Sequence, residues 1–94
     1  MADEATDCYV SVTWRSATTG TELESLLGLV VEHLQHAPHI SHAALGDRTN
    51  TADGMVEIVG YSSHLYEHSA IGMFTGAIAT AVFRAEKRLR YGDG

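Results

Sequence analysis

A chain of 94 residues with a formal charge of −6 is too short for two independent domains, and its charge repels a nucleic-acid backbone. Its apolar fraction of 45% and charged fraction of 19% are those of a globular chain and exclude a disordered one. We therefore expect a single domain over residues 1–94, with a flexible start at 1–7 and no nucleic-acid partner.

The cysteine count and the longest apolar run bear on the compartment. The single cysteine, Cys8, cannot form an internal disulfide, which a small exported domain would usually need. The N-terminal residues are acidic and lack the basic and apolar regions of a signal peptide. The longest uncharged run, 69–83, is shorter than the roughly 20 apolar residues that span a bilayer. The sequence predicts a cytoplasmic protein without a membrane partner.

Residues 8–15 are predicted to form a half-buried strand, because apolar and polar residues alternate strictly there. The apolar side carries Cys8, Val10, Val12 and Trp14. No further strand follows the last helix to pair with this one. We therefore expect a sheet edge that either pairs with another subunit or is shielded by the acidic N-terminal segment.

The first helix follows a turn at 16–20 and is predicted to begin at Thr21. Thr21 and Glu24 have the spacing of a capping box, in which the two side chains satisfy free amides of the helix start. Apolar residues then recur at helical spacing from Leu23 to Leu34. Pro38 ends the helix, because the residue before a proline avoids helical geometry.

The next segment is predicted to be a β-hairpin followed by a second helix. Residues 40–46 and 55–61 are the two strands, and the polar stretch 47–54 between them ends in Asp-Gly, which is typical of a hairpin loop. In the later strand Val56 and Ile58 should face inward. The second helix is expected from about residue 69 to residue 90.

This order of elements predicts an α+β fold, a two-layer β-α-β-β-α sandwich. A three-stranded antiparallel sheet would carry two helices on one face, and right-handed crossovers would put the third strand between the first and the second. The order is similar to that of a ferredoxin-like motif that lacks its last strand. The similarity is one of topology.

The second helix is predicted to be buried on more than one side, because it carries no charge from Ala70 to Phe83. One stripe should cover the sheet, namely Ile71, Phe74, Ile78, Val82 and Ala85. Glycines at 72 and 76 either let the two helices of one chain pack closely or admit another subunit, and we favour the second interpretation. The contact expected in a two-fold homodimer comprises Met73, Gly76, Ala77, Thr80 and Phe83.

The sheet face away from the helices is the candidate ligand site. The residues expected to project there are Tyr9, Ser11, Thr13, Arg15, His42, Glu57 and Tyr61. Such a face is a small-molecule floor, a solvated surface or a surface covered by another subunit. In a small enzyme, Glu57 and His42 would perform acid–base chemistry there while Arg15 holds an anion.

Six histidines raise the alternative of metal binding. The segment 64–68 reads H-x-x-E-H, which resembles the inverzincin metallopeptidase signature, with His64 and His68 as ligands. It precedes a helix in a chain far shorter than such peptidases, and we interpret the match as a coincidence of spacing. His33 and His36 are interpreted as solvated residues on the polar side of the first helix. We expect no metal and no cofactor.

Motifs for covalent catalysis are missing from the sequence, which has neither a nucleophile elbow nor a glycine-rich phosphate loop. We interpret the chain as a non-catalytic, homo-oligomeric module that binds either a small molecule at a subunit boundary or another protein. The alternatives are a small enzyme that uses the open sheet face and a histidine-based metal-binding protein. Fold alone does not choose among them.

Overall fold

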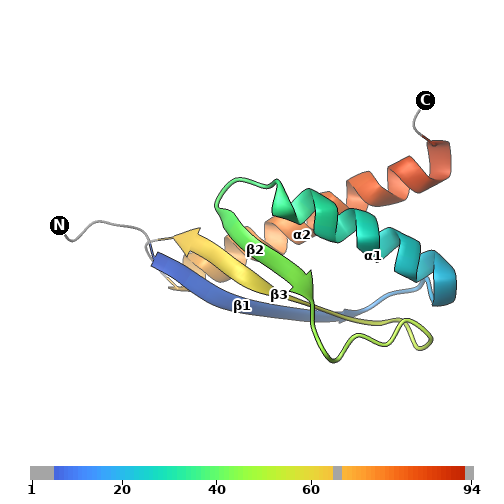
Figure 1. Cartoon of the computed structure of the whole chain (residues 1–94), viewed down its shortest axis with the longest axis horizontal. Helices are drawn as coiled ribbons and strands as arrows, with labels where there is room; N and C mark the ends of the chain where they lie inside the picture. The colour runs from blue at the N-terminus through green and yellow to red at the C-terminus, as the bar shows by residue number, and fades with distance from the viewer. Residues whose placement is uncertain (1–5, 65–66, 93–94) are drawn as a thin grey trace.

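A computed structural model describes residues 6–64 and 67–92 and has two layers, a sheet and a pair of adjacent helices (Figure 1). The elements in chain order are β1 (Thr6–Arg15), α1 (Gly20–Gln35), β2 (Ile40–Leu45), β3 (Met55–His64) and α2 (Glu67–Tyr91). The sheet is antiparallel with the order β1-β3-β2. The predicted α+β fold and the central place of the third strand are confirmed.

The hydrophobic core lies between the sheet and the helices and receives residues from all five elements. Its strand members are Val10, Ile40, Ala43, Val56 and Ile58. Val56 and Ile58 are completely buried, as the alternation predicted. Because both helices pack onto this one side, the other side of the sheet has no covering element among the described residues.

Strand β1 is an edge of the sheet. It pairs with β3 over its whole length, from Thr6 opposite His64 to Arg15 opposite Met55, and no described strand lies on its other side. It begins two residues before the expected Cys8, so Thr6 and Asp7 belong to the sheet. Residues 1–5, where a shielding segment was expected, lie outside the described part of the chain.

Helix α1 begins at Gly20, and the predicted capping box at Thr21 is wrong. The N-cap is Thr19, whose side chain makes no capping hydrogen bond. The hairpin loop holds the helix start instead, because the Gly20 amide donates to the Thr51 carbonyl over 2.8 Å and the Thr51 hydroxyl donates to the Glu24 carboxylate over 3.2 Å. This tertiary contact takes up the carboxylate that a local motif would have used.

Helix α2 approaches the sheet mainly through small residues. Its buried set is Ala70, Phe74, Ile78, Ala81 and Ala85. Ile71, predicted to face the sheet, is 49% exposed, so its placement was wrong. The alanines allow a close approach in which the Phe74 ring lies over Gly60 of β3, where an added Cβ would be 3.0 Å from Cζ. None of the described helices is long and apolar enough to cross a membrane.

Candidate functional site

The open face of the sheet carries the seven predicted ligand-binding residues, which come from all three strands and do not gather in one place. Tyr9, Ser11, Thr13 and Arg15 follow one another along β1, all of them exposed. Glu57 and Tyr61 lie on β3, and His42 lies opposite Tyr61 on β2. The side chains project as predicted, but strand register separates them along the sheet.

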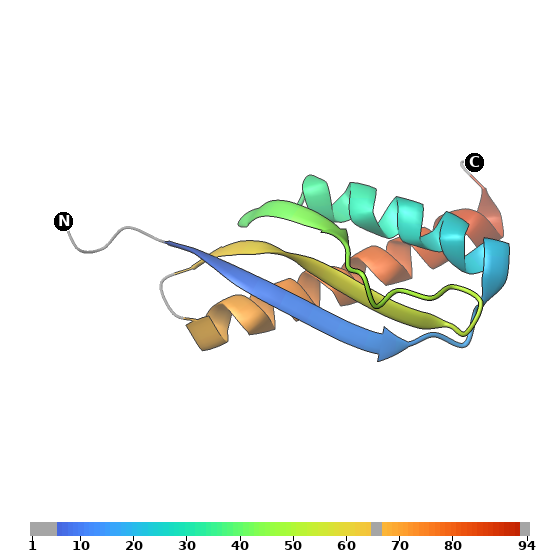
Figure 2. The ribbon, with the colours of Figure 1, turned by 60° about the horizontal axis from the view of Figure 1, so that its bottom comes forward.

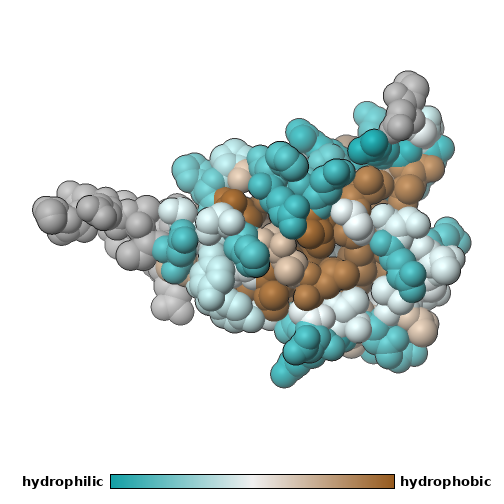
Figure 3. Space-filling view, in the orientation of Figure 1, coloured by the Kyte–Doolittle hydropathy of each residue, from teal (hydrophilic) through white to brown (hydrophobic). Residues whose placement is uncertain are grey.

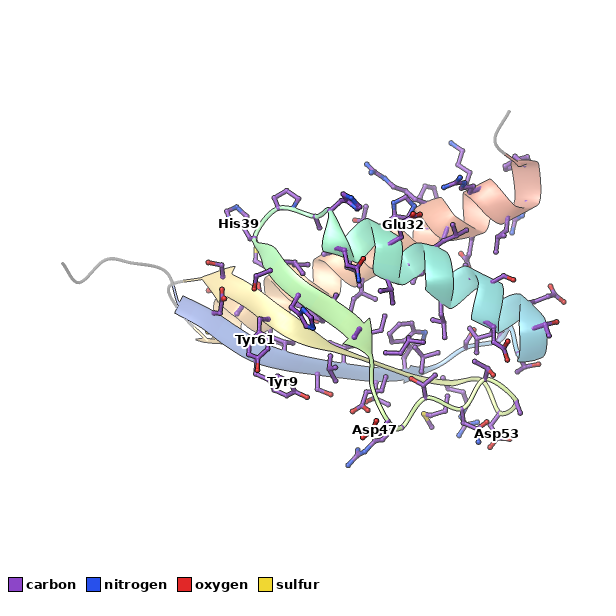
Figure 4. All side chains as sticks on the ribbon, viewed as in Figure 1. Tyr9, Glu32, His39, Asp47, Asp53 and Tyr61 are labelled. Carbon is purple, nitrogen blue, oxygen red and sulfur yellow. The ribbon has the colours of Figure 1, made fainter. Side chains whose placement is uncertain are left out.

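One end of the face is an aromatic platform. Tyr9 and Tyr61 are direct cross-strand partners, with ring centroids 5.6 Å apart and an interplanar angle of 66°. The His42 ring lies 6.5 Å from that of Tyr61 at 53°. Figure 4 shows the two tyrosines together on the outer side of the ribbon, far from Asp53 in the hairpin loop. Both tyrosine rings are packed edge to face and are exposed to solvent.

The middle of the face is organised by the Glu57 carboxylate. It accepts a hydrogen bond from the Ser11 hydroxyl and another from the Arg48 backbone amide, each 3.0 Å long. Glycine at position 46 makes room for it, because a Cβ there would collide with the carboxylate. The amide of Arg48 lowers the pKa of Glu57, partial burial opposes this, and the Ser11 hydrogen bond and the Arg48 charge lower it further. Glu57 is held as a carboxylate and is a weak base.

Arg15 lies at the opposite end of the face from the aromatic platform. Its Nη1 donates to the Asp53 carbonyl over 3.1 Å. Glu57 precedes Tyr61, the cross-strand partner of His42, by four residues, which is about 13 Å along a strand. The acid–base pair considered for an enzyme, Glu57 with His42, is therefore not formed in this structure.

A hollow of about 350 Å³ lies beside the Glu57 carboxylate. It is lined by Tyr9, Leu45, Gly46, Asp47, Arg48, Glu57 and Val59. Only Tyr9 and Glu57 were predicted from the sequence as ligand residues. Asp47 and Arg48 were missed because they belong to the hairpin loop. The alternation of apolar and polar residues in a strand does not indicate where a loop lies relative to β3.

A second hollow, of about 420 Å³, separates the end of α1 from α2. Its lining is His33, His36, Ala37, Pro38, His39, Met73, Ala77, Thr80, Ala81 and Arg84. The interpretation of His33 as a solvated residue is wrong for its Nε2, which is buried and has no hydrogen-bond partner. Among the described side chains, which do not include those of residues 64–68, no three His, Cys, Asp or Glu come close enough to hold a metal ion. The H-x-x-E-H segment lies outside the described side chains.

The outward face of α2 is uncovered by the described part of the chain. Phe83 is 66% exposed, and a Cβ added at Gly72 or Gly76 would meet no described atom within 4 Å. The two glycines therefore do not serve the packing of α1 against α2. Of the expected oligomer contact, Gly76 and Phe83 point outward, whereas the other three residues line the hollow beside α1.

Hydrophobic surface also reaches the front of the molecule. Figure 3 shows it between the polar side chains of α1 and the hairpin loop. Leu45, at the end of β2, is 43% exposed.

Comparisons with known proteins identify no relative from which a function could be inferred. The chain matches no known protein family, and no curated protein or solved structure is significantly similar to it.

Proposed function

We propose that the protein is a non-catalytic, homo-oligomeric binding module of the cytoplasm. The observation that carries this proposal is the outward face of α2, where Gly72, Gly76 and Phe83 are covered by no described part of the chain. Each glycine costs a helix interior about 1 kcal/mol relative to alanine. Glycines without an intrachain contact favour the close approach of another backbone, and a second copy about a two-fold axis is the commonest partner.

The open sheet face supports a binding role better than a catalytic one. Glu57 already accepts two hydrogen bonds and its pKa is lowered, so it is poorly suited to remove a proton. His42 and Arg15 lie at opposite ends of the face. The exposed tyrosine pair and the hollow beside Glu57 suit a small molecule or a segment of another protein.

Sedimentation of matched glycine variants tests the oligomer. Gly76 of α2 and Gly28 of α1 are both exposed helix glycines with open space around them. We expect the wild type to sediment as a dimer or a larger species at micromolar concentration. Gly76→Glu should lower the sedimenting mass, because an unpaired charge buried in the contact would dissociate the oligomer. Gly28→Glu should leave the sedimenting mass unchanged.

Circular dichroism must show that both variants keep the native helix content. Ala77 is unsuitable for this test, because it packs against the core and a charge there would disturb its own subunit. A wild type that stays monomeric at high concentration, or a Gly76→Glu variant with wild-type mass, would contradict the proposed contact.

A further inference from the structure

The unpaired backbone of β1 has a definite pattern along the sheet edge. The Gly46 amide donates to the Glu57 carbonyl over 2.8 Å and the Ser63 amide donates to the His39 carbonyl over 2.7 Å, so odd-numbered residues of β3 bond toward β2. Even-numbered residues of β3 therefore bond toward β1, where their partners are also even-numbered. The amides and carbonyls of Asp7, Tyr9, Ser11, Thr13 and Arg15 consequently point to the open edge.

We propose that β1 pairs with β1 of a second copy, antiparallel and about a two-fold axis at Ser11. A two-fold axis perpendicular to the sheet keeps the helices of both copies on one side. Odd-numbered residues of β1 then lie opposite odd-numbered residues of the second copy, and even-numbered opposite even-numbered. Because β1 spans Thr6–Arg15, the registers centred on Val10 and Ser11 give the longest overlap. Only the register centred on Ser11 places Asp7 opposite Arg15 of the second copy, and it does so at both ends.

The end charges are available for this pairing. Asp7 accepts a hydrogen bond from the Ser41 hydroxyl over 3.2 Å, and Arg15 donates to a backbone carbonyl, so neither meets an opposite charge within the described chain. Exposed ion pairs add little affinity, but they discriminate between registers because a shift by two residues separates them. The ladder of backbone hydrogen bonds and the inner side chains provide the association energy.

The inner side of β1 is apolar and incompletely covered within one copy. Cys8, Val12 and Trp14 are half-buried and pack at the margin of the core. In the Ser11 register, Val10 lies beside Val12 of the second copy, and Cys8 lies beside Trp14 of the second copy. These pairs are of the closer, non-hydrogen-bonded kind, so both inner surfaces lose water on association.

Helix α2 offers a second apolar contact at the same edge. Its Met73 and Ala77 flank faces α1, so the opposite flank, with Ile71, lies on the side of the open β1 edge. Figure 2 shows β1 at the front of the sheet, with the first turns of α2 emerging below it. The 49% exposed Ile71 would be covered by the second copy's strand, which takes the place of the fourth strand of a ferredoxin-like sheet.

This contact rests on the homo-oligomeric function proposed above, but it uses a different surface from Gly72, Gly76 and Phe83. With both contacts the wild type forms a species larger than a dimer. Loss of either contact leaves a dimer, and loss of both leaves a monomer. The masses of a series of variants can therefore contradict one of the two contacts without contradicting the other.

Charge exchange tests the register in the Gly76→Glu background, where association depends on β1 alone. Asp7→Arg or Arg15→Asp places like charges opposite each other at both ends and should weaken dimerisation roughly tenfold or more in sedimentation. The double variant Asp7→Arg/Arg15→Asp, or a mixture of the two single variants, should restore it. Glu32→Arg on α1, an exposed acid remote from β1, is the control and should have no such effect.

Cysteine cross-linking gives a second measurement that does not depend on charge. In a Cys8→Ser background, Val10→Cys/Val12→Cys should form a covalent dimer on mild oxidation, since non-hydrogen-bonded partners are close enough for a disulfide. Val10→Cys alone should not cross-link, because it would do so only in the register centred on Val10.

Each remaining outcome overturns a defined part of the proposal. Cross-linking of the single variant overturns the Ser11 register. Absence of cross-linking together with an unchanged mass for Asp7→Arg overturns the β1 contact and leaves the α2 contact standing. A mass that falls only with the β1 variants overturns the α2 contact, and a monomeric wild type overturns both.

Discussion

The two helices cover the same sheet face but differ in what they leave outside. On α1 the buried residues are those of the single apolar stripe, Leu23, Leu26, Leu27, Val30 and Leu34. On α2 three of the five buried residues are alanines, while the larger Ile71, Met73 and Phe83 are exposed. A helix with one contact concentrates its large apolar residues there, whereas α2 distributes them around its circumference.

This difference explains why the apolar stripe predicted for α1 is buried, whereas that predicted for α2 is correct for Phe74, Ile78 and Ala85 and wrong for Ile71. The stripe through Ile71 is a good apolar face, but the stripe through Ala70 and Ala81 permits the closer approach to β3 at Gly60. Ile71 and Phe83 are then left exposed, and the proposed oligomer contacts would cover them. If this is right, substitutions on the inner side of α2 should lower the stability of the subunit, and substitutions on its outer side should weaken association between copies.

The largest effect should come from exchanging the two phenylalanines of α2 for alanine. Phe74 is completely buried, so Phe74→Ala should reduce the free energy of unfolding by about 3–5 kcal/mol through lost burial and a cavity. Phe83→Ala should change subunit stability by less than about 0.5 kcal/mol and should weaken association. Urea unfolding at low protein concentration separates the two quantities. Equal destabilisation by both variants would refute the assignment of inner and outer sides.

Gly60→Ala should show how closely α2 and β2 approach the central strand. An added Cβ would collide with the His42 carbonyl and crowd the Phe74 ring, so we expect a loss of about 1–3 kcal/mol in unfolding free energy. Ser62→Ala is the matched control, two residues along the same side of β3. The Ser62 hydroxyl is buried without a partner, so its removal should be neutral or stabilising. A fully stable Gly60→Ala variant would mean that the approach is looser.

Alanine at Gly28 and Gly76 compares the helices directly. Both sites are exposed and open, so each substitution should stabilise the isolated subunit by up to about 1 kcal/mol through helix propensity. Gly76→Ala should in addition raise the dissociation constant of the oligomer, and Gly28→Ala should not. Thermal unfolding and sedimentation provide the two measurements. An unchanged oligomer in both variants would show that the α2 glycine is not at a contact.

The smallest effect is expected at Glu57, on the sheet face that neither helix covers. Its pKa in the folded chain lies below the ordinary 4.5, so its contribution to stability is present above that value and is lost as pH falls through the folded pKa. Glu57→Gln should therefore be less stable than the wild type at pH 7, and the difference should shrink below about pH 4.5. Ser11→Ala, which keeps the Arg48 hydrogen bond, should show a weaker form of the same dependence. A difference independent of pH would contradict the assigned hydrogen bonds.

Local pattern determined most of the secondary structure from the sequence alone. The alternation from Cys8 to Trp14 and the spacing from Leu23 to Leu34 each describe one element with a single buried side, and such patterns are independent of the rest of the fold. Element order and crossover handedness then specified the sheet order. The ends were less certain, since β1 starts at Thr6 and α1 starts through a contact with Thr51.

Tertiary structure alone decided the finer rotation of α2 over the sheet and how the polar residues of the open face are grouped. Helix rotation depends on the shape of the surface beneath it. The close approach above Gly60 keeps Phe74 in the core and turns Ala70, in place of Ile71, toward the sheet. Register along β3 separates Glu57 from His42, and the hairpin loop brings the Arg48 amide to the Glu57 carboxylate. These contacts are between residues distant in the sequence, so the spacing of neighbouring residues could not predict them.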